Sequence, residues 1–292
     1  MQVFQRIHDT LLYKEQLIST SQVHSPPSLP PLSTLQLVHD ADYIRAFTSG
    51  TLPPAIKRRI GFGEVVSDPI LIQRTLSEVA GTILTAQLAL SHGMAVNCAG
   101  GTHHAFRHSG SGFCIVNDIA IAIEVMLKID KSIQRALVVD CDVHQGDGTS
   151  SLFPHRHHDV FTLDIHAANN FPARKQQSSL DIGLPDGTDD DTYLSVLANA
   201  LTSVLTDFKP DIVIYDAGVD PHQDDALGRL SLTDDGLYRR DMLVLDTCVA
   251  HGVAVAGLVG GGYHHDLDVL ADRHCYLHRA ALQLFPTIKR LM

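Results

Sequence analysis

The sequence lacks the features that would place a protein in a membrane. None of its 292 residues belongs to an apolar run of 18 or more, so no membrane-spanning helix is expected. The first residues, MQVFQRIHDTLLYKEQL, contain neither an apolar signal core nor a small-residue cleavage site. These absences predict a cytoplasmic protein with no membrane partner.

Cysteine and positive charge are also scarce. The five cysteines are odd in number and show no CxxC spacing, which favours a reducing, cytoplasmic setting. The chain has 22 Lys and Arg against 33 Asp and Glu, a net charge of −11. Because nucleic-acid binding needs clusters of Lys and Arg on the phosphates, no direct nucleic-acid partner is expected.

What remains is a composition able to form a core, with 45% hydrophobic and 19% charged residues. The Pro-rich stretch 25–33 is too short to divide domains, so we expect one domain over 1–292. Apolar strands alternate with helices, which predicts an α/β fold of three layers: a mainly parallel open sheet with helices on both faces. The expected strands are 95–101, 136–142, 160–166, 211–218 and 253–262, and the expected helices are 37–50, 70–91, 115–128, 190–207, 233–251 and 266–284.

Polar clusters follow the ends of these strands. They read GGTHHAF (100–106), DCDVHQGDG (140–148), DIH (164–166), YDAGVDPHQDD (215–225) and GGGY (260–263). Because the carboxyl ends of parallel strands meet at one edge of a sheet, these clusters are expected to border one ligand crevice.

The D-x-H pattern of Asp142 and His144 indicates a metal site. On a strand, residues two apart point to the same side, so both side chains could reach one ion. Asp140 has the same parity but lies one pleat deeper, and Asp220 is the best candidate for a third ligand. Two carboxylates and one imidazole leave an open position for water, which is typical of catalytic zinc and also suits iron(II). Taken alone, D-x-H is a weak signal, and an isolated match is better explained by a carboxylate that caps the following helix or turn.

The adjacent His103 and His104 are candidates for proton transfer near neutral pH, whereas two other doublets, 157–158 and 264–265, lack acidic surroundings and are expected to be solvated. Each catalytic imidazole needs a carboxylate behind it, and Asp140 and Asp147 are available. Tyr263 follows three glycines. It fits either a packed aromatic residue or a phenol that donates to an oxyanion.

These motifs, in this order and with GSGFCIVND at 110–118, resemble the zinc-dependent histone deacetylase family, which has the arginase/deacetylase fold. The likeness runs from about Val38 to about Ala281. NFPARK at 170–175 and the compact length resemble most the class IV branch and its bacterial relatives. The resemblance implies that residues 1–292 form one deacetylase-like catalytic domain.

The resemblance also implies roles for matching residues. One zinc ion per chain would bind Asp142, His144 and Asp220. His103 and His104 match the acid/base pair, with Asp140 and Asp147 behind them, and Tyr263 matches the tyrosine that polarises the acyl carbonyl. The wall of the acyl tunnel matches Gly112, Phe113 and Phe171. A structural potassium ion matches Asp140, Asp142, His144, Asp164 and Ile165.

Three positions depart from related patterns. The family's first strand is not found before MQVFQRIHDTLL, so either the start lies upstream or the sheet edge is built otherwise. No rim aspartate that grips substrate backbone is found; the loop 58–68 offers only Glu64 and Asp68. Gly146 stands where dinuclear arginases carry the aspartate of a second metal, so one catalytic metal is expected.

The resulting prediction is a hydrolase that removes acetyl or longer acyl groups from N-ε-acyl-lysine in proteins or peptides. One alternative is an amidohydrolase of small acylated amines such as acetylpolyamines, but Leu227 lies where such enzymes would carry an acidic gate. A second is a catalytically silent module that binds acyl-lysine. A third, a dinuclear ureohydrolase, is disfavoured by Gly146.

Overall fold

The computed structural model describes residues 2–129 and 131–291, and a parallel sheet forms its centre. Within these residues the strand order is β1-β6-β5-β2-β3-β4, and every pairing is parallel. The strands are β1 (Met94–Val96), β2 (Ala136–Asp140), β3 (Val160–Ala167), β4 (Leu180–Leu184), β5 (Ile212–Asp216) and β6 (Ala254–Leu258). The edge strand β4 was not predicted, because its residues alternate between half-buried and exposed and form no apolar run.

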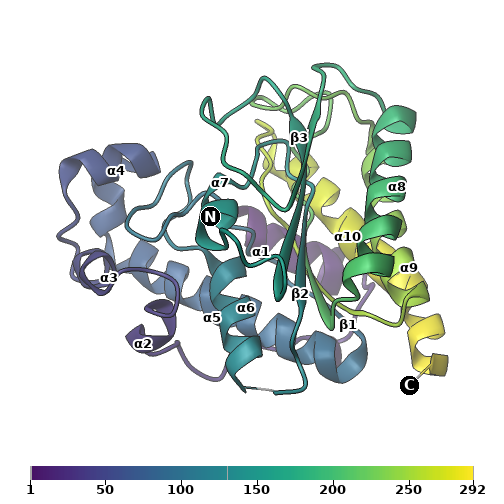
Figure 1. The fold of residues 1–292 in the computed structure, drawn as a ribbon, viewed down its shortest axis with the longest axis horizontal. Coiled ribbons are helices and arrows are strands. Elements are labelled where there is room, and N and C mark those ends of the chain that lie inside the picture. The colour runs from purple at the N-terminus through teal and green to yellow at the C-terminus, as the bar shows by residue number, and fades with distance from the viewer. Residues whose placement is uncertain (1, 130, 292) are drawn as a thin grey trace.

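Helices cover both faces of the sheet, which confirms the predicted three layers (Figure 1). Along β2, Ala136 and Val138 face one apolar core, while Leu137 and Val139 face the other. The first core is closed by α5 (Pro69–His92) and α6 (Asp118–Ile129). The second is closed by α8 (Asp190–Phe208), α9 (Asp234–Ala250) and α10 (Leu267–Leu291). No helix in the described part of the chain is long and apolar enough to cross a membrane.

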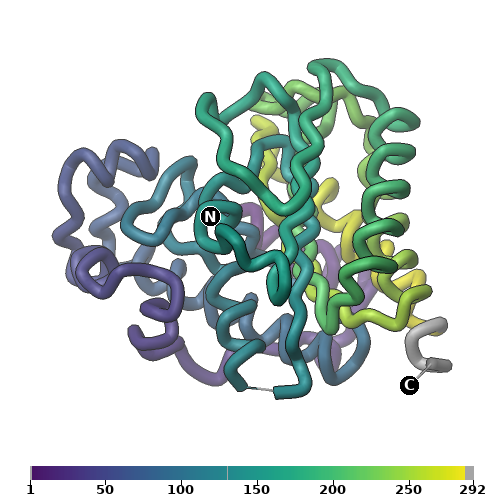
Figure 2. Tube along the Cα trace, in the orientation of Figure 1, coloured from purple at the N-terminus to yellow at the C-terminus, as the bar shows by residue number. Residues whose placement is uncertain are grey.

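In the segment before α5, residues 32–60 lie to one side of the sheet, opposite the C-terminal helices, whereas its first helix packs against the last helix of the chain (Figure 2). This segment contains the short helices α2 (Leu32–Leu35), α3 (Ala41–Thr48) and α4 (Pro54–Ile60), after α1 (Gln2–Asp9) and a π-helical turn, Thr10–Lys14. Two 3₁₀ turns, Thr20–Gln22 and Gly63–Ser67, complete it. The predicted helix over 37–50 is wrong at its start, because Asp40 is extended and its N–H bonds to the carbonyl of Arg107. The predicted loop 58–68 is largely the end of α4 and a 3₁₀ turn.

Four of the five predicted strands end earlier than predicted, whereas β3 ends one residue later, and most of the polar residues lie in the loops beyond the strands. β2 stops at Asp140, so Asp142 and His144 are not strand residues, and the argument from strand alternation is wrong for them. The short helix α7 (Asp147–Leu152) follows and was not predicted. What positions the polar side chains is therefore the set of loops at one sheet edge.

Candidate active site

Asp142, His144 and Asp220 meet beyond the carboxyl ends of β2 and β5. His144 Nδ1 lies 3.0 Å from Asp142 Oδ1 and 3.1 Å from Asp220 Oδ2. All three residues are buried, and their donor atoms lie within 4.8 Å of one another. A tetrahedral ion with bonds of about 2 Å holds its ligands roughly 3.3 Å apart, so this donor set fits a divalent metal ion.

Backbone N–H groups fix the direction of both carboxylates. Asp142 Oδ2 accepts a hydrogen bond of 2.9 Å from Gly261, and Asp220 Oδ1 accepts one of 2.8 Å from Val143. Each carboxylate therefore has one oxygen tied to a neighbouring loop, while the other faces His144. Loops that follow β2, β5 and β6 hold the ligand set together.

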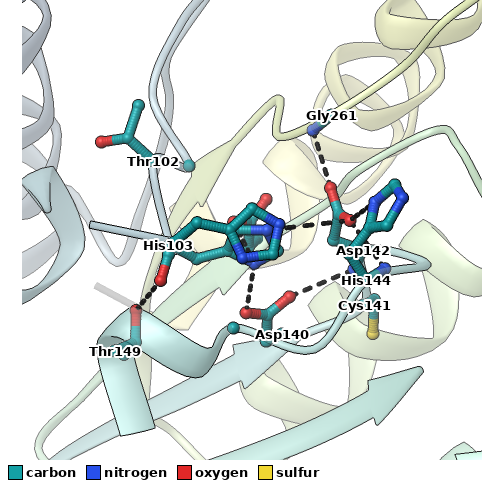
Figure 3. Close-up of polar contacts among 12 residues, drawn as sticks. Thr102, His103, Asp140, Cys141, Asp142, His144, Thr149 and Gly261 are labelled. Atoms are coloured by element: carbon teal, nitrogen blue, oxygen red, sulfur yellow. Dashed lines mark hydrogen bonds and ion pairs between the residues drawn. The ribbon is translucent and has the colours of Figure 1, made fainter. Parts of the chain in front are cut away.

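Two histidine–aspartate pairs lie beside this set. His103 Nδ1 is 2.8 Å from Asp140 Oδ2, as Figure 3 shows, and His104 Nδ1 is 2.7 Å from Asp147 Oδ1. The centres of the two imidazole rings are 4.1 Å apart. Because Nδ1 of each ring faces a carboxylate, His104 Nε2 is the nitrogen left for a substrate or water, while His103 Nε2 lies 3.8 Å from Asp142 Oδ1.

The two histidines differ in charge because their surroundings differ. Burial lowers the pKa of His103, but Asp140 and Asp142 outweigh burial, and the pKa rises well above its ordinary value. Burial and the neighbouring charge of His103 lower the pKa of His104 to about 4. In the metal-free protein His103 is therefore the cation, and His104 is the neutral imidazole that can accept a proton near pH 7.

The histidine loop is held by residues that the sequence reasoning did not single out. The carbonyl of His103 accepts hydrogen bonds from the Thr149 N–H at 2.9 Å and from Asn117 Nδ2 at 3.3 Å. The Asn117 N–H in turn donates to His39 Nε2 at 2.9 Å. Asn117 belongs to the GSGFCIVND motif, in which it directly precedes Asp118. This polar pair after an apolar stretch is the feature from which a structural role could have been predicted.

Asp216, the last residue of β5, was also missed. It is fully buried, and its Oδ2 lies 3.9 Å from His103 Nδ1. Neither of its oxygens has a hydrogen-bond partner among the described residues. Burial and the charge of Asp140 raise the pKa of Asp216 well above its ordinary value. In the sequence this acid is part of the YDAG motif. Nothing in that motif distinguishes a functional Asp216 from an acid that merely ends a strand.

Asp164 and Ile165, from the expected potassium set, lie in β3 and are buried. Asp164 Oδ2 accepts the Gly146 N–H at 2.8 Å, and its Oδ1 is 2.6 Å from His166 Nδ1. With Asp181, these side chains form another group of the described part of the chain whose donor atoms lie close enough to bind an ion. His166 and Asp181 were not predicted.

A cavity of about 240 Å³ opens above the ligand set. It is lined by the three expected tunnel residues, by Leu227 at the position of the expected gate, by three of the polar site residues and by Asn170. The full lining is His104, Gly112, Phe113, His144, Asn170, Phe171, Leu227 and Tyr263. Phe171 stands edge-on to the His104 ring, with centroids 4.9 Å apart. A larger cavity of about 520 Å³ lies beside β1 and contains none of the polar strand-end residues, so its size does not make it the reaction site.

Asp225 links Tyr263 to the mouth of this cavity. Its Oδ2 accepts the Tyr263 N–H at 2.7 Å, and its Oδ1 accepts the N–H groups of Leu227 and Gly228, each at 2.9 Å. Asn170 Nδ2 donates to the Leu227 carbonyl at 2.9 Å. Three lining residues, Phe171, Leu227 and Tyr263, are thus connected through one hydrogen-bonded chain. Burial raises the pKa of Tyr263, so its phenol stays protonated and can donate.

Two glycines are required by close approaches. A Cβ on Gly146 would lie 2.4 Å from Asp140 Oδ2, so a side chain at this position would displace the carboxylate behind His103. Gly112 has φ +50, and a Cβ there would lie 2.6 Å from His104 Cδ2. The first contact gives a physical reason why no second-metal carboxylate stands at position 146.

Comparisons with known proteins identify the family of this chain. The family model described as the histone deacetylase domain matches residues 1–279. A protein of Picosynechococcus sp. described as uncharacterized is 51% identical over 285 residues, which cover 98% of this chain and 93% of that protein. Acetoin utilization protein AcuC of Bacillus subtilis is 34% identical over 262 residues, covering 81% of this chain and 66% of AcuC.

Solved structures share the fold. The crystal structure of acetylpolyamine aminohydrolase from Burkholderia pseudomallei superposes with a TM-score of 0.74 at 20% identity, covering 96% of this chain and 89% of that one. At this identity the likeness concerns the fold alone. Together with the family match over nearly the whole chain and the metal-binding geometry, it shows that this chain belongs to the histone deacetylase family and is a metal-dependent amide hydrolase that acts on acetylated substrates.

Proposed function

We propose that this enzyme hydrolyses the amide of N-ε-acyl-lysine in proteins or peptides. The observation that carries the proposal is the placement of His104, backed by Asp147, in an apolar cavity whose wall includes His144, which lies next to Asp142 and Asp220. An apolar passage suits the methylene chain of lysine, and the polar end suits its acyl amide.

One zinc ion per chain, held by the carboxylates of Asp142 and Asp220 and by His144 Nδ1, is the proposed cofactor. When bound there, it would lower the pKa of a water molecule and polarise the acyl carbonyl. Iron(II) would suit the same donors. We also propose the structural potassium site at Asp140, Asp142, His144, Asp164 and Ile165, where a cation offsets buried carboxylates.

The residues of the site have different roles in the reaction. His104 accepts a proton from the attacking water at Nε2 and then gives it to the leaving lysine nitrogen, while Asp147 holds its Nδ1. His103, charged and paired with Asp140, stabilises the negative charge that develops nearby. The Tyr263 hydroxyl donates to the acyl oxygen as the tetrahedral species forms. Water adds to the carbonyl carbon and the C–N bond breaks, which yields a carboxylate and a lysine amine.

The test is turnover on a substrate panel, with metal content measured on the same sample. Acetyl-lysine and myristoyl-lysine peptides should be hydrolysed faster than acetylputrescine. A preference for acetylputrescine would favour the small-amine alternative instead. Binding of acyl-lysine without turnover by zinc-loaded protein would mean a silent binding module, and two bound manganese ions would favour a dinuclear ureohydrolase.

A further inference from the structure

The mouth of the cavity is built by four segments, 57–64, 105–113, 168–175 and 224–229, here called the mouth segments. Phe113, Phe171 and Leu227 form its rim and are 45%, 43% and 46% exposed. Segment 57–64 belongs to the rim because the Phe113 N–H donates to the Ile60 carbonyl at 2.7 Å and the Phe62 ring lies 5.5 Å from that of Phe113.

The mouth segments differ in charge from the rest of the chain. They contain seven Lys and Arg and three Asp and Glu. The whole chain, in contrast, contains 22 Lys and Arg and 33 Asp and Glu. Each of the three acids is already engaged. Glu64 pairs with Lys57 at 2.7 Å, Asp224 pairs with Arg273 at 3.3 Å, and both oxygens of Asp225 accept backbone N–H groups.

Several cations of the mouth segments have no such partner. Arg58 and Arg174 are exposed and form no ion pair with any described residue. Arg174 lies next to Lys175, whose Nζ donates at 2.6 Å to the carbonyl of Asn170, a residue that lines the cavity. The Arg59 guanidinium stacks 4.7 Å above the Phe106 ring, which neutralises no charge.

Arg107 is also exposed, but its carbonyl accepts the N–H of Asp40, so an exposed acidic residue lies next to it. This leaves Arg58, Arg59 and Arg174 as the exposed arginines of the mouth segments that form no ion pair with a described residue. In a protein of net charge −11, the segments next to the apolar rim thus carry three exposed arginines that form no ion pair with any described residue.

We propose that this mouth selects acyl-lysines that are flanked by acidic residues in the protein or peptide substrate. This inference rests on the proposed function and names its substrate class. The acyl-lysine chain would enter between Phe113, Phe171 and Leu227, while carboxylates on the flanking residues approach Arg58, Arg59 and Arg174. Basic tails and polyamines would meet like charge and find no free carboxylate, which costs affinity and slows association.

The experiment compares three acetyl-lysine peptides of equal length, with glutamate, alanine or lysine on both sides of the acyl-lysine. At low salt, kcat/KM should be about tenfold higher for the glutamate than for the lysine peptide, and the ratio should shrink at 0.5 M NaCl because exposed charges are screened. An equal rate for all three peptides, or a preference for lysine, would overturn the selectivity. No turnover of the alanine peptide or any other acyl-lysine would instead refute the proposed function.

Charge-reversal variants locate the effect. Arg58→Glu and Arg174→Glu should each lower the glutamate-to-lysine ratio several-fold while the rate for the alanine peptide stays near wild type. Arg239→Glu is the matched control, because Arg239 is exposed on α9 and pairs with Asp191 and Asp235, away from the mouth segments. If the control changes the ratio as much as the two mouth variants, net charge rather than the mouth is responsible and the proposal is wrong.

Discussion

The floor and the mouth of the cavity differ in burial and in charge. At the floor, Asp142, His144 and Asp220 are at most 4% exposed, and backbone N–H groups fix the carboxylates. At the mouth, Phe113, Phe171 and Leu227 are nearly half exposed, and cations stand free. The difference suggests a division of labour in which the floor determines the chemistry and the mouth determines which substrates reach it. Substitutions at the floor should therefore lower kcat/KM strongly and by a similar factor for every substrate. Substitutions at the mouth should have small effects on kcat/KM that depend on the substrate.

The largest effect is expected for Asp220→Ala at the floor. The variant should lose its bound metal and about 10³-fold or more in kcat/KM, since even outer partners of metal ligands cost 10–100-fold. Metal analysis and kinetics on one sample check this. Asp224→Ala, an exposed acid of the same loop, is the control. Stoichiometric zinc retained in Asp220→Ala would move the third ligand elsewhere.

Tyr263→Phe should lower kcat by about 10²–10³-fold for every acyl substrate, because one donor to the developing oxyanion is lost. Metal content should stay at one ion per chain, since the phenol is not a ligand. Steady-state kinetics with metal analysis provides the measurement. Full activity in this variant would remove Tyr263 from the mechanism.

Asp225→Asn lies between floor and mouth and sharpens the comparison. Asparagine keeps one accepting oxygen and replaces the other with an NH2 group that cannot accept, so either the Tyr263 N–H or the Leu227 and Gly228 N–H groups lose their acceptor. Because both contacts hold the segment that positions Tyr263, kcat should fall by about tenfold, by analogy with outer partners of catalytic groups. In a Tyr263→Phe background the same change should cost little in kcat. Asp224→Asn is the matched control. If the effects of Asp225→Asn and Tyr263→Phe multiply, Asp225 does not act through the phenol.

Metal binding should weaken in acid. Burial lowers the pKa of His144, but hydrogen bonds to Asp142 and Asp220 outweigh it and raise this pKa to about 10 in the metal-free protein. A proton must leave His144 Nδ1 before a metal binds, so apparent affinity should rise about tenfold per pH unit from pH 6 to 8. Chelator competition measures the slope. A slope near zero would mean that no proton is released, so that His144 is already neutral in the metal-free protein.

The smallest effect is expected at the rim. Leu227→Ala removes a half-exposed apolar side chain, worth about 1 kcal/mol of contact and roughly fivefold in affinity. KM for an acyl-lysine peptide should rise by about this factor with kcat nearly unchanged, because the contact is the same in ground and transition states. A fall in kcat comparable to that of Tyr263→Phe would contradict the division between floor and mouth.

The same comparison explains what the sequence could predict. The apolar strands 136–140 and 212–216 and the acids that follow them show the sheet, its active edge and the ligand candidates, because buried strands leave a strong apolar pattern. Local patterns could not show that Asp216 lies beside His103, or that Asp225 binds the Tyr263 backbone 38 residues away. These contacts depend on which loops become neighbours in three dimensions. For the same reason, the local excess of positive charge in the mouth segments could not be predicted from the net charge of the whole chain, which is −11.

The most direct test of the whole account is a zinc titration of metal-free protein, with hydrolysis of an acetyl-lysine peptide measured at each step. The account predicts that activity rises linearly and stops at one zinc ion per chain, and that Asp220→Ala stays inactive throughout. Activity that is maximal in metal-free protein, or that needs two ions per chain, would contradict a single catalytic metal held by Asp142, His144 and Asp220.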